Sequence, residues 1–429
     1  MALPKPKQDA TDARLGALTA RAGAGWAAEA RAAAVARVQD MGLPHARDEY
    51  WKYTKPATLV DVEVPKATVF TADEVTLWES VERLNVVFND GVFDADASDD
   101  LSLEGLEIER LADVANKDIH WVKDLFGVLE TRGQTPVDRP LTALNTAFAT
   151  DGLVIRVTGQ VSKPVNLIYN HKSDSSDVYL HHCIKLEEGA EMTLLETGAG
   201  AARFNTVLET EVADKAAFHH VRVQGRDHER RTATAVFAQL GTESTFKSFT
   251  LTMNGVLTRN ECVIELLGDD ANATIAGACV GDGKDFHHDD TVFITHDAVN
   301  CESRQVFKKV LRNGATGVFQ GKILVKADAQ KTDGYQISQS LLLDDDSQFL
   351  AKPELEIYAD DVACSHGSTS GAIDEDALYY LRSRGVPMQE ATDLLVLAFL
   401  AEALEEIDNE DLSDALYDRL NDWLARRAG

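Results

Sequence analysis

The sequence predicts a mainly β protein with a β-helix-like solenoid core and α-helical regions before and after it. From about residue 151, short β-rich runs such as LVIRV, VNLIYN and TFKSFTLTM follow one another. No helix-length amphipathic stretch separates them. Several of these runs begin with a polar or glycine turn followed by one small residue, and this feature recurs along the chain.

The recurring small residues have a nearly regular spacing. They are Ala190, Ala216, Ser244, Ala271, Ala315 and Ser347, at intervals of 26, 28, 27, 44 and 32 residues. A repeat in the high twenties is typical of solenoids, in which each unit buries its face against its neighbours. A β-sandwich would also give short, evenly spaced strands and stays open as the alternative. The 44-residue interval coincides with the segment GDGKDFHHDD and predicts an insertion there.

Helical regions are expected on both sides of the β-rich part. The alanine-rich run AAEARAAAVARVQ predicts a helix that ends at Gly42, before Pro44. After Gly371, DEDALYYLRSRG predicts a helix ending at Gly385, and two further helical stretches follow. In the last of these, leucines and Trp423 recur at helical spacing and form one apolar stripe. We therefore expect an N-terminal helical and mixed region at 1–145, the solenoid at 146–365 and a helical domain at 366–429.

The amino-acid composition argues against several classes of partner and location. The chain has 429 residues, a formal net charge of −29 and a pI near 4.7. Such an acidic surface makes nucleic acid and anionic membrane poor partners. The longest apolar run, LLVLAFLA, is too short to span a bilayer, and the N-terminus lacks the apolar run of a signal peptide. Five scattered cysteines without a C-x-x-C pair argue against a disulfide framework, so a reducing cytoplasm is expected.

Several stretches that could suggest catalysis or metal binding do not have the residue pattern that such motifs require. The run from Gly277 to Asp285 resembles a phosphate-binding loop but is one residue too long and ends in an acid, so ATP chemistry is expected from another chain. The pairs His181-His182 and His219-His220 lie in β-like runs, where adjacent side chains face opposite ways, so neither pair can chelate one metal. No serine or cysteine lies in a G-x-S-x-G elbow.

Cys364 and His366, in YADDVACSHGSTSG, form the best candidate metal site. If the preceding strand continues through them, positions i and i+2 share one face, and thiolate and imidazole both suit iron, zinc or an iron–sulfur cluster. Two ligands do not close a tetrahedral site. Other segments or another subunit would have to complete it, and a purely structural role for both residues stays open.

Longer stretches resemble a known family. FHHDDTVFITHDAVNCESRQVFKKVL, FQGKILVKADAQKTDGYQISQSLLL, KPELEIYADDVACSHGSTSG and DALYYLRSRGV resemble the SufB/SufD family of iron–sulfur cluster assembly proteins. Upstream, LPHARDEYWKYT and ALNTAFATDGLVIRV are also similar, so the resemblance covers essentially the whole chain. The SHG form, without the glutamate-rich segment and extra cysteines of the SufB branch, resembles the SufD branch.

The resemblance implies a fold and a set of partners. The core would be a right-handed parallel β-helix that pairs with a SufB-type paralogue, and the C-terminal helices would bind a SufC-type ABC ATPase. The chain would be a non-catalytic scaffold subunit on which a transient iron–sulfur cluster is built and transferred, with a further role in iron entry. A homodimer is expected when the chain is alone.

The resemblance also gives roles to the candidate residues. The family histidine implicated in nascent-cluster formation maps onto His366, and the cysteine two positions before it maps onto Cys364. The pair would then be half of a shared metal site at the partner interface. Two alternatives remain: a metal-dependent enzyme on a β-helix, and a structural partner without cluster ligands of its own.

Overall fold

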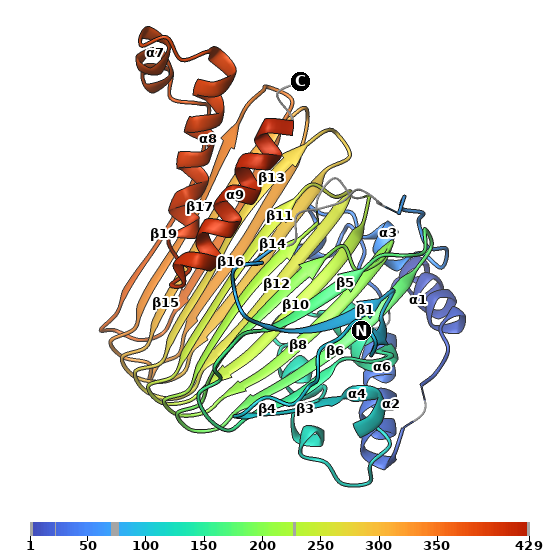
Figure 1. The fold of residues 1–429 in the computed structure, drawn as a ribbon. Coiled ribbons are helices and arrows are strands. Elements are labelled where there is room, and N and C mark those ends of the chain that lie inside the picture. Colours follow the sequence, from blue (N-terminus) through green and yellow to red (C-terminus); the bar gives the residue numbers. More distant parts are fainter. Residues whose placement is uncertain (1–2, 22, 70–76, 226–228, 427–429) are drawn as a thin grey trace.

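Two long sheets face each other across a common interior and form a solenoid (Figure 1). The structure is a computed structural model, and it describes residues 3–21, 23–69, 77–225 and 229–426. Successive strands alternate between the sheets, so each turn of the solenoid adds one strand to each sheet. Between β4 and β19, neighbouring strands within each sheet are parallel. The predicted parallel solenoid is confirmed, and the sandwich alternative is excluded.

In space, the strands of each sheet follow one another from the last turn of the solenoid to the first. The first sheet contains β19 (Ala363–Gly371), β17 (Asp333–Leu342), β15 (Glu302–Arg312), β13 (Asn272–Asp282), β11 (Thr245–Met253), β9 (Ala217–Gln224), β7 (Glu191–Gly198), β5 (Val165–Asn170), β1 (Leu84–Asn89) and β2 (Val92–Asp94). The second sheet contains β18 (Gln348–Ile357), β16 (Thr316–Val325), β14 (His287–His296), β12 (Leu257–Leu266), β10 (Arg231–Leu240), β8 (Arg203–Val212), β6 (Asp177–Leu186), β4 (Leu153–Val157) and β3 (Leu106–Arg110).

One corner of the solenoid explains most of the small-residue repeat. Before each strand of the first sheet from β9 to β17, the chain passes through a left-handed residue with φ between +54° and +61°. These residues are Lys215, Glu243, Asp270, Asn300 and Lys331. Each is followed by a small side chain that points inward and is fully buried: Ala216, Ser244, Ala271, Cys301 and Thr332. The tight left-handed turn brings the next side chain directly under the neighbouring turns, which leaves room for a small residue.

The predicted insertion within the 44-residue interval is wrong. Cys301 and Thr332 continue the series after Ala271, in positions where the sequence repeat was not recognised. Ala315 and Ser347 precede β16 and β18, so they belong to a different corner, the one that leads into the second sheet. The segment GDGKDFHHDD contains the end of β13, an ordinary turn at 283–286 and the start of β14.

The N-terminal region covers the outer face of the second sheet. Its helices are α1 (Lys5–Ala17), α2 (Gly25–Met41), α3 (Ala57–Val60), α4 (Leu111–Val114), α5 (Val128–Arg132) and α6 (Pro140–Phe148), with 3₁₀ turns at Glu49–Trp51 and Trp121–Asp124. The predicted alanine-rich helix lies within α2, which ends at Gly42 with φ of +66°. Residues of β6, β8 and β10 pack under α2 and α6 in one hydrophobic core.

The aromatic segment LPHARDEYWKYT crosses the outer face of the second sheet towards the last turn. Trp51 is buried and stacks on the Arg259 guanidinium, 4.1 Å from the ring centroid. The Tyr50 ring contacts Phe293, and its hydroxyl donates to Glu354 of β18 over 2.7 Å. The aromatic segment is therefore tied to the last turns of the solenoid.

Three helices follow the solenoid. They are α7 (Glu375–Ser383), α8 (Met388–Leu404) and α9 (Glu410–Arg426). In Figure 1, α8 and α9 lie along the outer face of the first sheet, and α7 projects beyond it. Trp423 and the leucines of the predicted stripe pack on β9, β11, β13 and β15, whereas α7 buries none of its residues.

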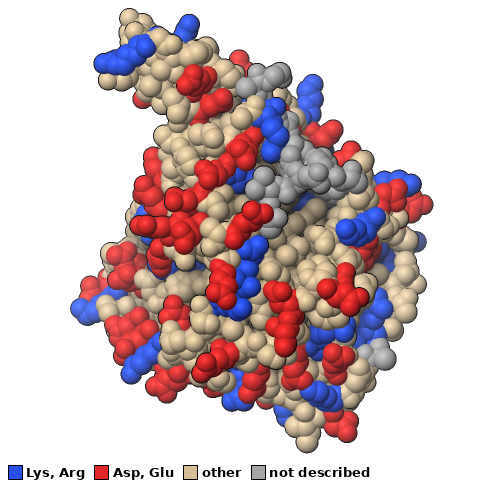
Figure 2. Space-filling model, viewed as in Figure 1, with Lys and Arg blue, Asp and Glu red and all other residues tan. Residues whose placement is uncertain are grey.

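The limits of the solenoid differ from the expected 146–365. Strands β1, β2 and β3 precede residue 146 and already belong to the two sheets, and β19 continues to Gly371. Acidic side chains are spread over the face seen in Figure 2, in keeping with the net charge of −29. In the part of the chain that the structure describes, no helix is both long enough and apolar enough to cross a membrane.

Candidate functional site

Strand β19, which carries Cys364 and His366, forms the last rung of the first sheet. It pairs in parallel with β17, so that Cys364 lies beside Gly334 and His366 beside Gln336. Further along, the Ser338 and Ser368 hydroxyls are 3.0 Å apart on the inner face. Because side chains alternate along a strand, Cys364 and His366 both belong to this inner face. They share one face, as the sequence analysis expected.

The two side chains differ in their surroundings. Cys364 is half-buried and packs with Ile323 and its apolar neighbours. Its Sγ would lie 3.1 Å from a Cβ at Gly334, so the glycine leaves room for the sulfur. Burial raises the pKa of the Cys364 thiol above its usual value, so a metal that binds the sulfur has to displace its proton.

His366 is exposed and faces the end of the interior. Within the described chain, the His366 imidazole forms no hydrogen bond or ion pair. The outer edges of β18 and β19 likewise have no strand partner within the described chain. An imidazole without internal bonds, beside two free sheet edges, can take a ligand at little cost to the fold.

A second group of metal-capable side chains lies elsewhere and was not foreseen. His181, Cys183 and Glu209 are fully buried, and their donor atoms lie within 4.8 Å of one another. The Glu209 carboxylate accepts hydrogen bonds from the backbone N–H groups of Gly127 (2.5 Å) and Glu130 (2.7 Å) at the start of α5. It also lies 2.8 Å from His181 Nε2.

This buried cluster has the character of a structural cap. The carboxylate already binds two backbone donors and an imidazole, and burial raises the pKa of the Cys183 thiol well above its usual value. A metal would have to displace those bonds. The spacing His181-x-Cys183 is visible in the sequence, but Glu209 joins only through the register of β6 with β8.

The histidine pairs behave as the strand alternation predicts. His181 and His219 lie on the outer face, whereas His182 and His220 lie inside the solenoid. His182 Nδ1 accepts from the Leu153 N–H over 3.0 Å, and its Nε2 lies 3.0 Å from the Tyr169 hydroxyl. Neither pair can therefore hold one metal.

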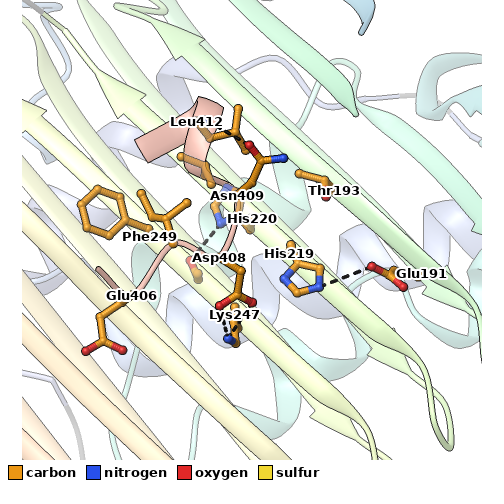
Figure 3. A pocket seen from close by; sticks show the side chains of 13 residues that line it. Glu191, Thr193, His219, His220, Lys247, Phe249, Glu406, Asp408, Asn409 and Leu412 are labelled. Carbon is orange, nitrogen blue, oxygen red and sulfur yellow. Dashed lines mark hydrogen bonds and ion pairs between the residues drawn. The ribbon is translucent and has the colours of Figure 1, made fainter. Parts of the chain in front are cut away.

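A pocket lined by His219, Lys247 and Asp408 lies away from β19 (Figure 3). It has a volume of about 320 Å³ and lies between the outer face of the first sheet and the loop joining α8 to α9. The Lys247 ammonium lies 2.7 Å from both carboxylate oxygens of Asp408 across it, and His219 lies 3.8 Å from Glu191. The Lys247–Asp408 pair holds the loop against the sheet, whereas His219 and Glu191 both lie on the sheet itself. Neither Cys364 nor His366 lines this pocket.

The last turn of the parallel solenoid thus carries an inward-facing Cys-x-His pair beside two strand edges that are unpaired within the described chain. Comparison with known families identifies the class of protein. Residues 168–399 match the SufBD core domain of SUF system FeS cluster assembly, and residues 18–167 match the SufBD protein N-terminal region. The chain belongs to the SufBD family of iron–sulfur cluster assembly proteins, as the sequence resemblance predicted.

Individual relatives agree with the family match. The iron–sulfur cluster assembly protein SufD of Escherichia coli is 29% identical over 89% of this chain and 90% of its own length. A SufBD family protein of Synechocystis is 27% identical, with 87% and 86% covered. SufD of Bacillus subtilis is 28% identical over 65% of each chain.

Proposed function

We propose that this chain is a SufD-type scaffold subunit, without catalytic activity of its own, that supplies half of the site on which an iron–sulfur cluster is assembled. His366 would donate its imidazole to the nascent cluster, and Cys364 would assist once its thiol is deprotonated. The observation that carries the proposal is the unpartnered His366 on the inner face of the last strand. Imidazole and thiolate are suitable ligands for iron, and two of them leave the site open for a second chain.

The second chain is proposed to be a SufB-type paralogue seated on the open end. The free edges of β18 and β19 support this, because unpaired N–H and C=O groups are a template for further strands. The same edge could serve a second copy of this chain when the paralogue is absent. Iron would enter the shared site at this junction, in the cytoplasm.

The C-terminal helices are proposed to bind a SufC-type ATPase. Tyr379 and Tyr380 on α7, and Met388 and Leu394 at the start of α8, are all exposed apolar side chains on a projecting element. Exposed aromatic and methionine side chains are enriched at protein interfaces. ATP hydrolysis would then come from the partner, in keeping with the run from Gly277 to Asp285, which does not match a phosphate-binding loop.

The decisive experiment is the iron and sulfide content of the co-expressed complex with His366→Ala. Cluster content should fall sharply while the complex stays assembled, since one exposed residue carries little of a large interface. Cys364→Ala should have a weaker or similar effect. Ser368→Ala, on the same face two positions further, is the matched control. Equal cluster content in wild type and the His366→Ala complex would refute the ligand role.

The ATPase contact has its own test. Tyr379→Ala combined with Tyr380→Ala changes only exposed residues and should weaken co-purification of the ATPase without altering the pairing at the open end. Tyr417→Ala on α9, also exposed, is the control. Full retention of the ATPase by the double variant would place the contact elsewhere.

A further inference from the structure

A row of inward-facing side chains runs along the first sheet and ends at His366. Its members are register partners on successive strands from β9 to β19: His220, Ser248, Ile275, Gln305, Gln336 and His366. Gln305 and Gln336 are fully buried, whereas His366 is exposed. The proposed ligand is therefore the outer end of a row whose last two members before it are buried amides.

The two amides leave one oxygen without a donor. Gln336 Nε2 donates to Gln305 Oε1 over 2.9 Å, whereas Gln336 Oε1 has no hydrogen-bond partner within the described chain. Because the nitrogen and the oxygen of an amide point in different directions, a nitrogen directed towards β15 leaves the oxygen directed away from that strand. The neighbour of β17 on its other side is β19, which carries His366. A buried acceptor without a donor is costly, so we expect this oxygen to receive a hydrogen bond.

The opposite sheet leaves space for this amide. A Cβ on Gly321 of β16 would lie 2.2 Å from Gln336 Nε2. Gly321 does not have a positive φ, so the close approach of the amide, rather than the backbone conformation, explains the glycine at this position. Gly321 thus gives the Gln336 side chain room to cross the interior.

Neighbouring pairs show that inner side chains of β17 and β19 bond directly to each other. The Ser338 and Ser368 hydroxyls are 3.0 Å apart, and the pair beyond them is also hydrogen-bonded. Gln336 and His366 form the adjacent inner pair on the same two strands. A bond between them would continue the series of side-chain hydrogen bonds to the candidate site.

An earlier histidine in the row shows which ring nitrogen can reach a neighbouring strand. His220 Nδ1 lies 2.9 Å from the hydroxyl of Ser248, its register partner on β11. His220 Nε2 stays available for a different partner and lies 2.8 Å from the Glu196 carboxylate. An imidazole in this row can therefore bond along the row through Nδ1 and present Nε2 elsewhere.

We propose that Gln336 is a positioning residue for His366, whose Nδ1–H donates a hydrogen bond to Gln336 Oε1. This inference rests on the ligand role proposed above. The exposed His366 ring reaches Oε1 by rotation about its side-chain bonds, which is fast at exposed positions. Since the tautomer of a neutral imidazole is set by the hydrogen bond that one nitrogen makes, this bond leaves the Nε2 lone pair free for iron and raises its basicity.

Ring-nitrogen NMR of the isolated full chain tests the hydrogen bond without any metal. In a histidine-labelled sample at about pH 8.5, where imidazole is neutral, the His366 signals are those that His366→Ala removes. Wild type should carry the proton mainly on Nδ1. Gln336→Met keeps the volume but removes the acceptor, so its His366 should return to the Nε2–H form that neutral imidazole prefers in water. A wild-type spectrum with the proton mainly on Nε2 would overturn the proposal.

Two further variants separate the acceptor from general damage to the interior. Gln305→Met breaks the same amide–amide hydrogen bond but leaves the Gln336 oxygen in place, so the Nδ1–H form should persist. Gln336→Glu keeps an acceptor oxygen and should also retain that form. A tautomer that changes as much in Gln305→Met as in Gln336→Met would contradict a direct bond.

Iron titration of the co-expressed complex tests the consequence for the shared site. Gln336→Met should weaken the apparent iron affinity about tenfold or more, the usual loss when the hydrogen-bond partner of a metal-ligating histidine is removed. Gln305→Met should match wild type. Loss of cluster in His366→Ala together with wild-type affinity in Gln336→Met would refute the positioning role and leave the ligand role standing. Full cluster content in His366→Ala would instead refute the ligand role, and the positioning role with it.

Discussion

The two ends of the solenoid are built differently. At the first turn, β2 pairs antiparallel with β1 and β3 pairs antiparallel with β4, while Leu101 and Leu103 pack against the core. At the last turn, β18 and β19 end in free edges, and their inner faces are half-buried or exposed. The first turn is therefore covered by two antiparallel strands and an apolar loop. The last turn, where His366 lies, has no such cover within the described chain.

The largest difference between the ends should appear in core truncations. Phe88, fully buried in the first turn, contacts Phe93, Tyr169 and His182. Phe88→Ala should lower the free energy of unfolding by about 3–5 kcal/mol. Phe349→Ala, in the half-buried last turn, should cost less than about half of that. Urea denaturation measures both, and equal losses would show that the last turn is closed as firmly as the first.

A smaller difference in stability is expected between variants of the buried cluster around His181 and variants of the proposed ligand His366. Glu209→Ala removes the acceptor of two backbone N–H groups and the partner of His181, and should destabilise by about 3 kcal/mol. His366→Ala should change stability by about 0.5 kcal/mol or less. In the co-expressed complex the order should reverse, with iron content reduced by His366→Ala and kept in the folded fraction of Glu209→Ala. Loss of iron from the folded fraction of Glu209→Ala would show that the buried cluster binds metal.

Acid should weaken the closed end through its buried histidines. Burial lowers the pKa of His182 from 6.5 to about 4. Below pH 6.5 the unfolded chain binds a proton that the folded chain does not bind. Stability therefore falls as pH drops from 6.5 towards 4, by about 3 kcal/mol for this group. His182→Asn should flatten the pH dependence of the melting temperature between pH 6.5 and 4. An unchanged slope in His182→Asn would contradict this origin.

The smallest effect is expected at the pocket of Figure 3. The Lys247–Asp408 pair is largely exposed and joins the α8–α9 loop to the first sheet. Lys247→Ala should cost less than about 1 kcal/mol, because solvent screens such pairs. High salt should reduce the wild-type value towards that of the variant. A loss comparable with Phe88→Ala would show that the helices are attached mainly by charge rather than by their apolar stripe.

The repeat of small residues and the alternation of side chains along strands can be recognised in the sequence. They were enough to predict the solenoid and the shared face of Cys364 and His366. The sequence did not reveal that the series continues through Cys301 and Thr332, because what the corner requires is a compact side chain after a left-handed residue. Alanine or serine is one way to meet that requirement. Glu209 was missed because only cross-strand register brings it to His181.

The free edge also governs how the molecule comes apart. In a solenoid each turn touches only its neighbours, so cooperativity is nearly one-dimensional and fraying starts from an end that lacks a cap. Amide exchange should therefore be fastest in β18 and β19 and slow progressively towards β5. A partner that pairs with those edges would act as the missing cap, and its binding energy would appear as slower exchange in the last turns first. Assembly and completion of the fold would then be one event.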